Sequence, residues 1–255
     1  MKVEYSTHEV FEKPSDEIVK IWRYMDFSKF VSLLDRKALF FCRADTLSDP
    51  FEGSYSKANL NFRPTVYAGK IPEQVLNSAS LVFREIRRYT VLNCWNICEY
   101  DSAALWKLYL NGDGVAIQST FRRLTECFGS EANESVFIGK VKYIDYEKDW
   151  MPEGNMFYPF VHKRKSFESE QELRAVVMKF PPPDWNKDTN QLNLTKEVFD
   201  RGEYIDIDLD TLVEKVYVSP TSQEWFLDLI KSVSAKYSLE KEIIPSGLAD
   251  KNPVY

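Results

Sequence analysis

Short apolar and aromatic segments that suit β-strands alternate along this chain with segments of helical periodicity, but without the regular strand–helix–strand spacing of a parallel sheet. No glycine-rich fingerprint follows a strand, and neither a Walker sequence nor a G-x-S-x-G elbow occurs. These absences disfavour a doubly wound nucleotide-binding fold and an α/β-hydrolase. The pattern predicts an α+β fold with a mainly antiparallel sheet flanked by helices.

The predicted elements can be given by residue range. Asp26 is expected to cap a helix in which Phe27, Phe30, Val31 and Leu34 follow helical spacing. Further helices are predicted over 73–89, from Asp101 or Ser102 to Tyr109, from Thr120 to Phe128, and from Ser222 to Tyr237. Strands are predicted at 38–42, 90–95, 115–117, 137–143, 173–180, 204–208, 215–218 and 242–244, with a polar loop at 44–53.

Length and composition favour one folded domain over residues 1–255. Residues 1–20 are expected to form an N-terminal extension, and 181–191 an exposed proline-rich loop. The chain has 33 Lys plus Arg against 39 Asp plus Glu, a net charge of −6, and its many aromatic residues exclude disorder. No apolar run approaches the ~20 residues of a membrane span, and the first residues lack the apolar core of a signal peptide. We therefore expect a cytoplasmic protein.

Cysteine and histidine are too sparse to predict a metal site. The four cysteines are expected to be reduced and buried. Cys94 and Cys98 lie four positions apart, but no second cysteine pair and no suitably spaced histidine completes a zinc site.

The first group of polar residues with apolar neighbours consists of residues 22–24 and the loop at 49–53. Pro50 restricts Asp49 to an extended conformation, so the loop is expected to be rigid. Asp49 and Glu52 can then turn inward to bind a cation or to hold Arg23. The alternative is a salt-bridged loop that serves the fold alone.

The second constellation is aromatic. Trp106 and Tyr109 lie three positions apart on a predicted helix, beside a strand that carries Trp95 and Asn96. They are expected to form a wall for a planar ligand ring, or else to belong to the core.

The third constellation runs from 162 to 174. If a strand begins near Ser169, then Glu170, Glu172 and Arg174 share one face, next to the basic residues Lys163, Arg164 and Lys165. Neighbouring carboxylates raise one another's pKa and nearby cations lower it, which is how active sites tune carboxylates. The alternative is an ion-paired edge strand. The basic cluster is too short, in an acidic chain, to predict binding to duplex DNA.

The order of several motifs resembles a bacterial family, domain-of-unknown-function family twenty-nine seventy-one. The motifs are Trp22-Arg23-Tyr24, Phe30, Leu39-Phe40-Phe41, Asp49-Pro50-Phe51-Glu52-Gly53, Cys94-Trp95, Leu105-Trp106-x-x-Tyr109, Gly114-Val115-Ala116-Ile117, Lys163-Arg164, Phe167, Glu170-x-Glu172-x-Arg174 and Val218-Ser219-Pro220.

A more distant resemblance is to ADP-ribosyltransferase folds, which present an early polar residue on one strand, a serine-bearing or aromatic middle strand, and a glutamate that opens a late strand. Glu170-Gln171-Glu172-Leu173 is similar to their E-x-E segment, and Arg23 or Tyr24 is similar to the early residue. Where those enzymes commonly have Ser-Thr-Ser, this chain has 94–96, Cys-Trp-Asn. The resemblance implies a carboxylate that stabilises the oxocarbenium ion formed when nicotinamide leaves NAD, and an arginine that holds the pyrophosphate.

Three functions follow from these residues. The first is an NAD-consuming, ADP-ribosyltransferase-like enzyme, a toxin or phage-defence effector, with NAD as substrate and an unspecified protein or nucleic-acid acceptor. The second is a non-catalytic ligand-binding or interaction module. The third is a nuclease that holds a divalent ion with Asp49, Glu52, Glu170 and Glu172.

Glu172 and Glu170 are the candidate catalytic residues, and we expect the candidate residues to converge in space. The candidate ligand-binding residues are Arg23, Tyr24, Asp49, Glu52, Trp95, Asn96, Trp106, Tyr109, Lys163, Arg164 and Arg174.

Overall fold

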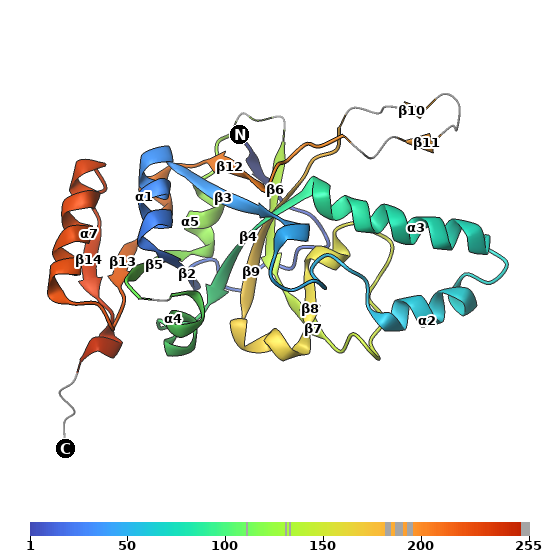
Figure 1. The fold of residues 1–255 in the computed structure, drawn as a ribbon, viewed down its shortest axis with the longest axis horizontal. Helices are drawn as coiled ribbons and strands as arrows, with labels where there is room; N and C mark the ends of the chain where they lie inside the picture. Colours follow the sequence, from blue (N-terminus) through green and yellow to red (C-terminus); the bar gives the residue numbers. More distant parts are fainter. Residues whose placement is uncertain are drawn as a thin grey trace, which may run out of the picture.

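A computed structural model describes residues 1–110, 112–130, 132, 134–181, 185–186, 191–192 and 196–250 of the chain. Within these residues a ten-stranded sheet forms the centre of the molecule, and helices flank it (Figure 1). Most neighbouring strands in this sheet are antiparallel, and the β1–β6 and β13–β14 pairs are parallel. The predicted α+β class with a mainly antiparallel sheet is confirmed.

The strand bounds are β1 Glu4–Ser6, β2 Lys20–Asp26, β3 Ala38–Arg43, β4 Thr90–Ile97, β5 Gly114–Thr120, β6 Ser135–Lys140, β7 Lys142–Ile144, β8 His162–Arg164, β9 Glu172–Met178, β10 Trp185–Asn186, β11 Gln191–Leu192, β12 Gly202–Asp206, β13 Lys215–Val218 and β14 Glu242–Pro245. The order along the large sheet is β1-β6-β9-β4-β2-β5-β13-β14, and β3 pairs with both β4 and β12. Two small sheets pair β7 with β8 and β10 with β11.

The α-helices are α1 Phe27–Arg36, α2 Lys57–Val66, α3 Glu73–Ile86, α4 Ala103–Tyr109, α5 Phe121–Glu126, α6 Leu209–Leu212 and α7 Glu224–Lys236. Short 3₁₀ helices occupy η1 Ala44–Thr46, η2 Arg87–Tyr89, η3 Tyr158–Phe160, η4 Lys165–Glu170 and η5 Gly247–Ala249. In Figure 1, α2 and α3 project beyond one end of the sheet, while α7 and β14 lie at the opposite end. Among the helices of the described residues, none is long and apolar enough to cross a bilayer.

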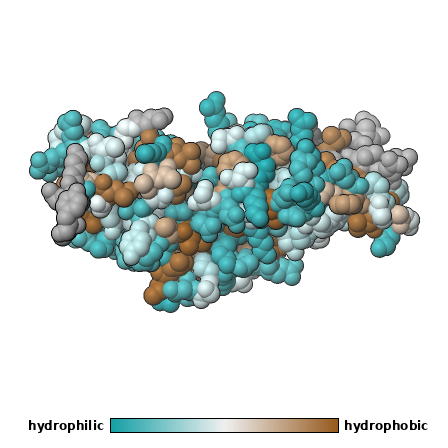
Figure 2. Space-filling view, turned by 90° about the horizontal axis from the view of Figure 1, so that it is seen from below, coloured by the Kyte–Doolittle hydropathy of each residue, from teal (hydrophilic) through white to brown (hydrophobic). Residues whose placement is uncertain are grey.

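The central strands β4 and β9 are covered on both faces, which explains their nearly continuous burial. Along β9, Leu173, Ala175 and Val177 point into the main hydrophobic cluster, which also contains Phe30 of α1. The opposite face carries Val176, which packs in a second cluster, together with the charged residues of the candidate site. On the face seen in Figure 2, hydrophobic residues are exposed in several separate areas between hydrophilic ones.

Helix α1 forms where helical periodicity predicts it. Asp26 ends β2 and caps the helix by accepting the backbone N–H of Lys29 at 2.8 Å. Lys37 then stops it in the left-handed conformation, with φ 48°. The helix thus connects β2 to β3 through two well-defined turns, and this connection shapes the candidate site.

The prediction that residues 1–20 form an extension is wrong. β1 is an edge strand of the sheet, in parallel register with β6, and Val3, Val10 and Phe11 are buried. The segment crosses β6 closely because Gly139 has no side chain: a Cβ there would lie 2.8 Å from the Cα atom of Phe11. The apolar residues of this segment are too few and irregularly spaced to have indicated a strand.

Replacing Gly139 by alanine tests this packing. The added methyl group has to displace the Phe11 backbone, so we expect the free energy of unfolding to fall by about 1–3 kcal/mol, measured by urea denaturation. Gly129→Ala is the control, because a Cβ at Gly129 meets nothing within 4 Å. Equal effects of the two substitutions would contradict the close packing of residues 1–20 on β6.

Several predicted boundaries also need correction. The strand predicted at 137–143 is divided into β6 and β7, the strand predicted to reach Phe180 ends at Met178, and Gln223 instead of Ser222 caps α7. Helices α2 and α6 were not predicted; α2 contains Pro64, which normally opposes a helix interior. The exposed loop predicted at 181–191 lies mostly outside the described residues, although β10 falls within it.

Candidate functional site

A fork in the large sheet opens beside β4. One edge of β4 pairs with β9 along most of its length, so β2 and β3 share the other edge. The short registers are Ile21↔Ile97 and Trp22↔Asn96 with β2, and Cys42↔Leu92 and Arg43↔Val91 with β3. Residues 93–95 therefore lie between the two strands without a ladder partner on this edge, and α1 spans the fork from β2 to β3.

A cavity of about 870 Å³ occupies this fork, a size typical of small-molecule sites. Ten of the thirteen candidate residues line it, which are Arg23, Tyr24, Asp49, Glu52, Trp95, Asn96, Tyr109, Lys163, Glu170 and Glu172. Arg164, Arg174 and Trp106 do not line it.

Arg23 provides a cation on one wall of the cavity. It follows Trp22, the last residue of β2 that pairs with β4, and its side chain reaches back across the fork. The guanidinium donates to the backbone oxygen of Cys94 at 2.6 Å, so it satisfies a carbonyl that lacks a strand partner. Burial lowers the pKa of Arg23, but an arginine stays charged at neutral pH. No carboxylate among the described residues forms an ion pair with it, so its charge is open to a ligand.

The opposite wall carries an acidic cluster at the start of β9. Glu172 is the first residue of β9 and lies across from Asn96 of β4. The prediction that Glu170 shares a strand face with Glu172 is wrong, because residues 165–170 form the 3₁₀ helix η4. Gln171, in the left-handed conformation with φ 40°, joins the two elements. Glu170 consequently reaches the cluster from the 3₁₀ helix, and the conclusion that the carboxylates meet holds for a different geometric reason.

Two buried cations bind three carboxylates in this cluster. Arg174 is 1% exposed and contacts Glu172 through Nε at 2.7 Å and Glu52 through Nη2 at 2.8 Å. Lys163 Nζ lies 2.6 Å from Glu170, 3.1 Å from Glu172 and 3.3 Å from Glu52. Three carboxylates against two cations leave a charge of −1 when all are ionised.

The two glutamates of the cluster titrate in opposite directions. Burial alone would raise the pKa of Glu172, but Arg174 and Lys163 outweigh it and lower the pKa to about 2. For Glu170, burial dominates over the bond from Lys163 and raises the pKa. Because the folded pKa of Glu172 is depressed, its contribution to stability is present above the ordinary pKa near 4.5 and is lost as pH falls towards 2.

Asp49 and Glu52 turn inward, but the prediction that they hold Arg23 is wrong. Asp49 accepts two hydrogen bonds from Arg164, the shorter at 2.7 Å. The Arg164 guanidinium also lies 4.3 Å from the ring centre of Phe51. The loop at 49–53 is thus tied to β8, at the outer side of the acidic cluster.

The predicted aromatic wall is only partly present. Trp106 is 4% exposed, packs edge-on against Tyr24 at 5.0 Å and donates to Asp101, so it belongs to the core behind the cavity. Tyr24 uses its hydroxyl to accept the backbone N–H of Ser102 at 2.7 Å. Tyr109, the last residue of α4, is half exposed and lines the cavity, with its ring stacked on that of Tyr24 at 6.5 Å.

Sequence reasoning missed several lining residues. Cys94 borders the cavity and hydrogen-bonds Glu172, so it is not simply a core thiol; burial raises its pKa, which keeps it protonated. Phe167, Phe40 and Tyr204 also line the cavity. Phe167 and Phe40 both belong to motifs of the family resemblance, which was the available signal, whereas no motif contained Tyr204.

The carboxylates proposed for a divalent ion are already paired with lysine and arginine side chains. Asp49, Glu52, Glu170 and Glu172 each contact lysine or arginine nitrogens at 3.3 Å or less. In the part of the chain that the structure describes, no group of three His, Cys, Asp or Glu side chains is arranged to hold a metal ion. The arrangement therefore gives the nuclease hypothesis no support.

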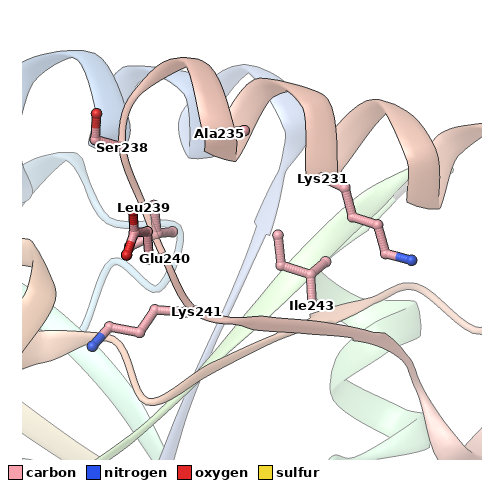
Figure 3. A pocket seen from close by; sticks show the side chains of 7 residues that line it. All are labelled: Lys231, Ala235, Ser238, Leu239, Glu240, Lys241 and Ile243. Atoms are coloured by element: carbon pink, nitrogen blue, oxygen red, sulfur yellow. The ribbon is translucent and has the colours of Figure 1, made fainter.

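A second hollow, of about 480 Å³, lies between α7 and β14 (Figure 3). Lys231 of α7 and Ile243 of β14 lie on its sides. Lys241 pairs with Asp210 at 2.6 Å. No cluster of carboxylates lines this hollow, so its chemistry differs from that of the cavity at the fork.

Comparison with protein-family models and with curated proteins finds no match for this chain.

Proposed function

We propose that the chain is an NAD-consuming enzyme of the ADP-ribosyltransferase type, which cleaves the bond between nicotinamide and ribose. The observation that carries this proposal is Glu172, a carboxylate with a pKa of about 2 that lines the same cavity as Arg23, and Arg23 forms no ion pair with a carboxylate of the described residues. A substrate with a developing positive charge and an anionic pyrophosphate matches both walls.

The chemistry uses few groups. When the bond between ribose C1′ and the nicotinamide nitrogen breaks, both electrons leave with neutral nicotinamide and C1′ becomes an oxocarbenium centre. The ionised Glu172 stabilises that charge, since the cluster retains an excess negative charge. Water or an acceptor nucleophile then forms the new bond to C1′ and loses a proton. Glu170, whose pKa is raised, is the base for that proton.

The order of the residues along the chain also supports the proposal. Arg23 comes from β2, Asn96 and Cys94 come from β4, and Glu172 opens β9. These three strands are neighbours in the sheet, in the order β9-β4-β2. An early polar residue, a middle strand and a glutamate opening a late strand are what the resemblance to ADP-ribosyltransferases implies.

The direct test is nicotinamide release from NAD by the purified protein, followed by chromatography, with and without protein or nucleic-acid acceptors. Binding is tested separately by thermal shift, because a ligand at 100 times its Kd adds roughly 2.7 kcal/mol of stability. Absence of both turnover and an NAD-dependent shift would overturn the proposal.

Arg23→Gln is expected to weaken NAD binding roughly 10- to 100-fold, because the charge-assisted bond to the pyrophosphate is lost. Isothermal titration measures the change in Kd. Lys29→Gln is the control: Lys29 also lines the cavity, but it is 70% exposed and paired with Asp26. Equal losses of affinity for the two variants would contradict the role of Arg23.

A non-catalytic binding or interaction module is the second candidate, favoured by the ion pairs that already engage Glu172. A carboxylate bound on two sides can serve stability alone. If Glu172→Ala lowers the free energy of unfolding by about 3–5 kcal/mol and the wild type releases no nicotinamide, this reading replaces the first.

A further inference from the structure

Arg174 was predicted to bind a ligand, but its side chain is 1% exposed and does not reach the cavity. It lies two residues after Glu172, on the same face of β9. We propose that Arg174 is a positioning residue that fixes Glu172 in its orientation and holds it as an anion for the reaction. The part of the inference that concerns catalysis rests on the proposed function. The part that concerns the contact between Arg174 and Glu172 rests on geometry alone.

The grip is two-pronged. Arg174 Nε donates to one oxygen of Glu172 at 2.7 Å and Nη2 donates to the other at 3.1 Å. A guanidinium that engages both oxygens fixes the plane of the carboxylate, which a single ammonium contact does not. Glu172 therefore has little rotational freedom.

The guanidinium itself is held from its far side. Glu52 Oε1 accepts from Nη2 at 2.8 Å, Glu52 Oε2 lies 2.8 Å from Nη1, and Nη1 also donates to the backbone oxygen of Phe160 at 3.0 Å. Arg174 is thus clamped between two carboxylates. The Asp49-Pro50-Phe51-Glu52 loop gains a role here: it anchors the arginine that holds Glu172.

Within the part of the chain that the structure describes, Lys163 is the other cation in contact with Glu172. The titratable and charged groups around Glu172 are Arg174 on β9, Lys163 on β8, Glu170 on η4, Glu52 in the 49–53 loop, Cys94 on β4, Arg23 on β2, Tyr109 on α4 and Tyr143 on β7. Of these, Lys163 alone also makes a cationic contact with Glu172, and it divides its charge among three carboxylates. Without Arg174, the largest interaction that offsets the desolvation of Glu172 is lost, so the pKa of Glu172 rises and its protonated form becomes more populated.

The test follows the Glu172 carboxyl carbon by NMR in full-length protein labelled at glutamate, with the resonance assigned by its loss in Glu172→Gln. In the wild type the resonance is expected to stay unchanged from about pH 7 to pH 4, because its pKa is about 2. In Arg174→Met it is expected to titrate with a midpoint at or above the ordinary glutamate value of roughly 4.3. An unchanged titration in Arg174→Met would overturn the proposal.

Arg63→Met is the matched control. Arg63 is likewise a buried arginine, 2.7 Å from a buried carboxylate of Glu153, but it belongs to α2. The control is expected to lose stability without changing the Glu172 titration. An equal shift in both variants would mean that general destabilisation, and not the loss of Arg174, moves the pKa, and would also overturn the proposal.

Arg174→Lys keeps a charge but loses the two-pronged bond, so it serves if Arg174→Met does not fold; its Glu172 midpoint is expected to lie between those of the wild type and the methionine variant. If neither folds while Arg63→Met does, Arg174 serves the fold and the proposal fails.

For activity, the ratio of kcat at about pH 5 to kcat at about pH 7 is expected to fall in the Arg174 variants and to stay constant in Arg63→Met. If the wild type releases no nicotinamide, the proposed function fails, while the NMR titration still decides whether Arg174 holds Glu172 ionised.

Discussion

Glu172→Gln is expected to lower kcat for nicotinamide release about 10²- to 10³-fold, the loss typical when one preorganised electrostatic contact to a transition state is removed. The amide keeps the size of the side chain and one oxygen that can accept from Arg174, but it carries no charge to stabilise the oxocarbenium centre. The Kd for NAD is expected to change much less than kcat, because the positive charge on ribose C1′ develops only in the transition state.

The control for this substitution is Glu153→Gln, which makes the same chemical change at another buried ion pair, with Arg63. It is expected to reduce stability without reducing kcat below the wild-type value. Circular dichroism and thermal unfolding verify that both variants are folded. A Glu172→Gln variant that turns over NAD at the wild-type rate would remove Glu172 from the chemistry, whatever its contribution to stability.

Local sequence signals predicted most of the secondary structure. The cap at Asp26 and the strands predicted at 115–117 and 204–208 depend on signals within a few residues. Each element forms close to its predicted place, as α1, β5 and β12. The prediction for residues 1–20 was wrong because their structure depends on a distant part of the chain. β1 exists because β6 offers it an edge more than a hundred residues later in the chain, and no local pattern contains that information.

The candidate site was predictable in its residues but not in its pairing. Charged residues next to apolar ones indicated that Asp49, Glu52, Glu170 and Glu172 turn inward to meet cations. All four pair with cations, and Glu170 is half buried while the other three are buried. Which cation meets which carboxylate depends on strand register and on the turn at Gln171, where a left-handed residue redirects the chain. Asp49 and Glu52 were expected to bind a cation or to hold Arg23. In the described structure Asp49 binds Arg164, and Arg23 instead donates to the backbone oxygen of Cys94.

Trp106 illustrates the limit of periodicity. The three-residue spacing between Trp106 and Tyr109 places both on neighbouring positions of one helix, but it does not say how far the covering strand extends. Tyr24 of β2 contacts both rings, edge-on with Trp106 and stacked on Tyr109, but Trp106 is 4% exposed and Tyr109 is 50% exposed. Trp106 also donates a hydrogen bond to Asp101, and the spacing of the two aromatic residues does not predict this contact.

Lys163→Met is expected to lower the free energy of unfolding at pH 7 by about 3–5 kcal/mol, the usual cost of removing one partner from a buried ion-pair network. Lys163 is 8% exposed and is the contact common to Glu52, Glu170 and Glu172. Without it, three carboxylates face the single charge of Arg174. Urea denaturation at several pH values measures the loss.

The loss of unfolding free energy in Lys163→Met is expected to be larger at high pH than at low pH. Burial already raises the pKa of Glu170, and loss of the bond from Lys163 raises it further. A carboxyl whose folded pKa exceeds its unfolded value destabilises the fold at high pH, and this penalty disappears as pH falls through the folded pKa. The difference between Lys163→Met and the wild type is therefore expected to be largest near pH 7 and to shrink towards about pH 5.

A second substitution separates this cause from a packing defect. Lys163→Met with Glu170→Gln removes the carboxyl that lost its partner, so the double variant is expected to recover part of the lost stability at pH 7. Lys57→Met is the exposed control: its partner is Glu147, both side chains are more than half exposed, and the loss is expected to stay below about 1 kcal/mol. A pH-independent deficit, or a double variant less stable than Lys163→Met, would show that Lys163 acts through packing of its chain against Phe167 and not through the carboxylates.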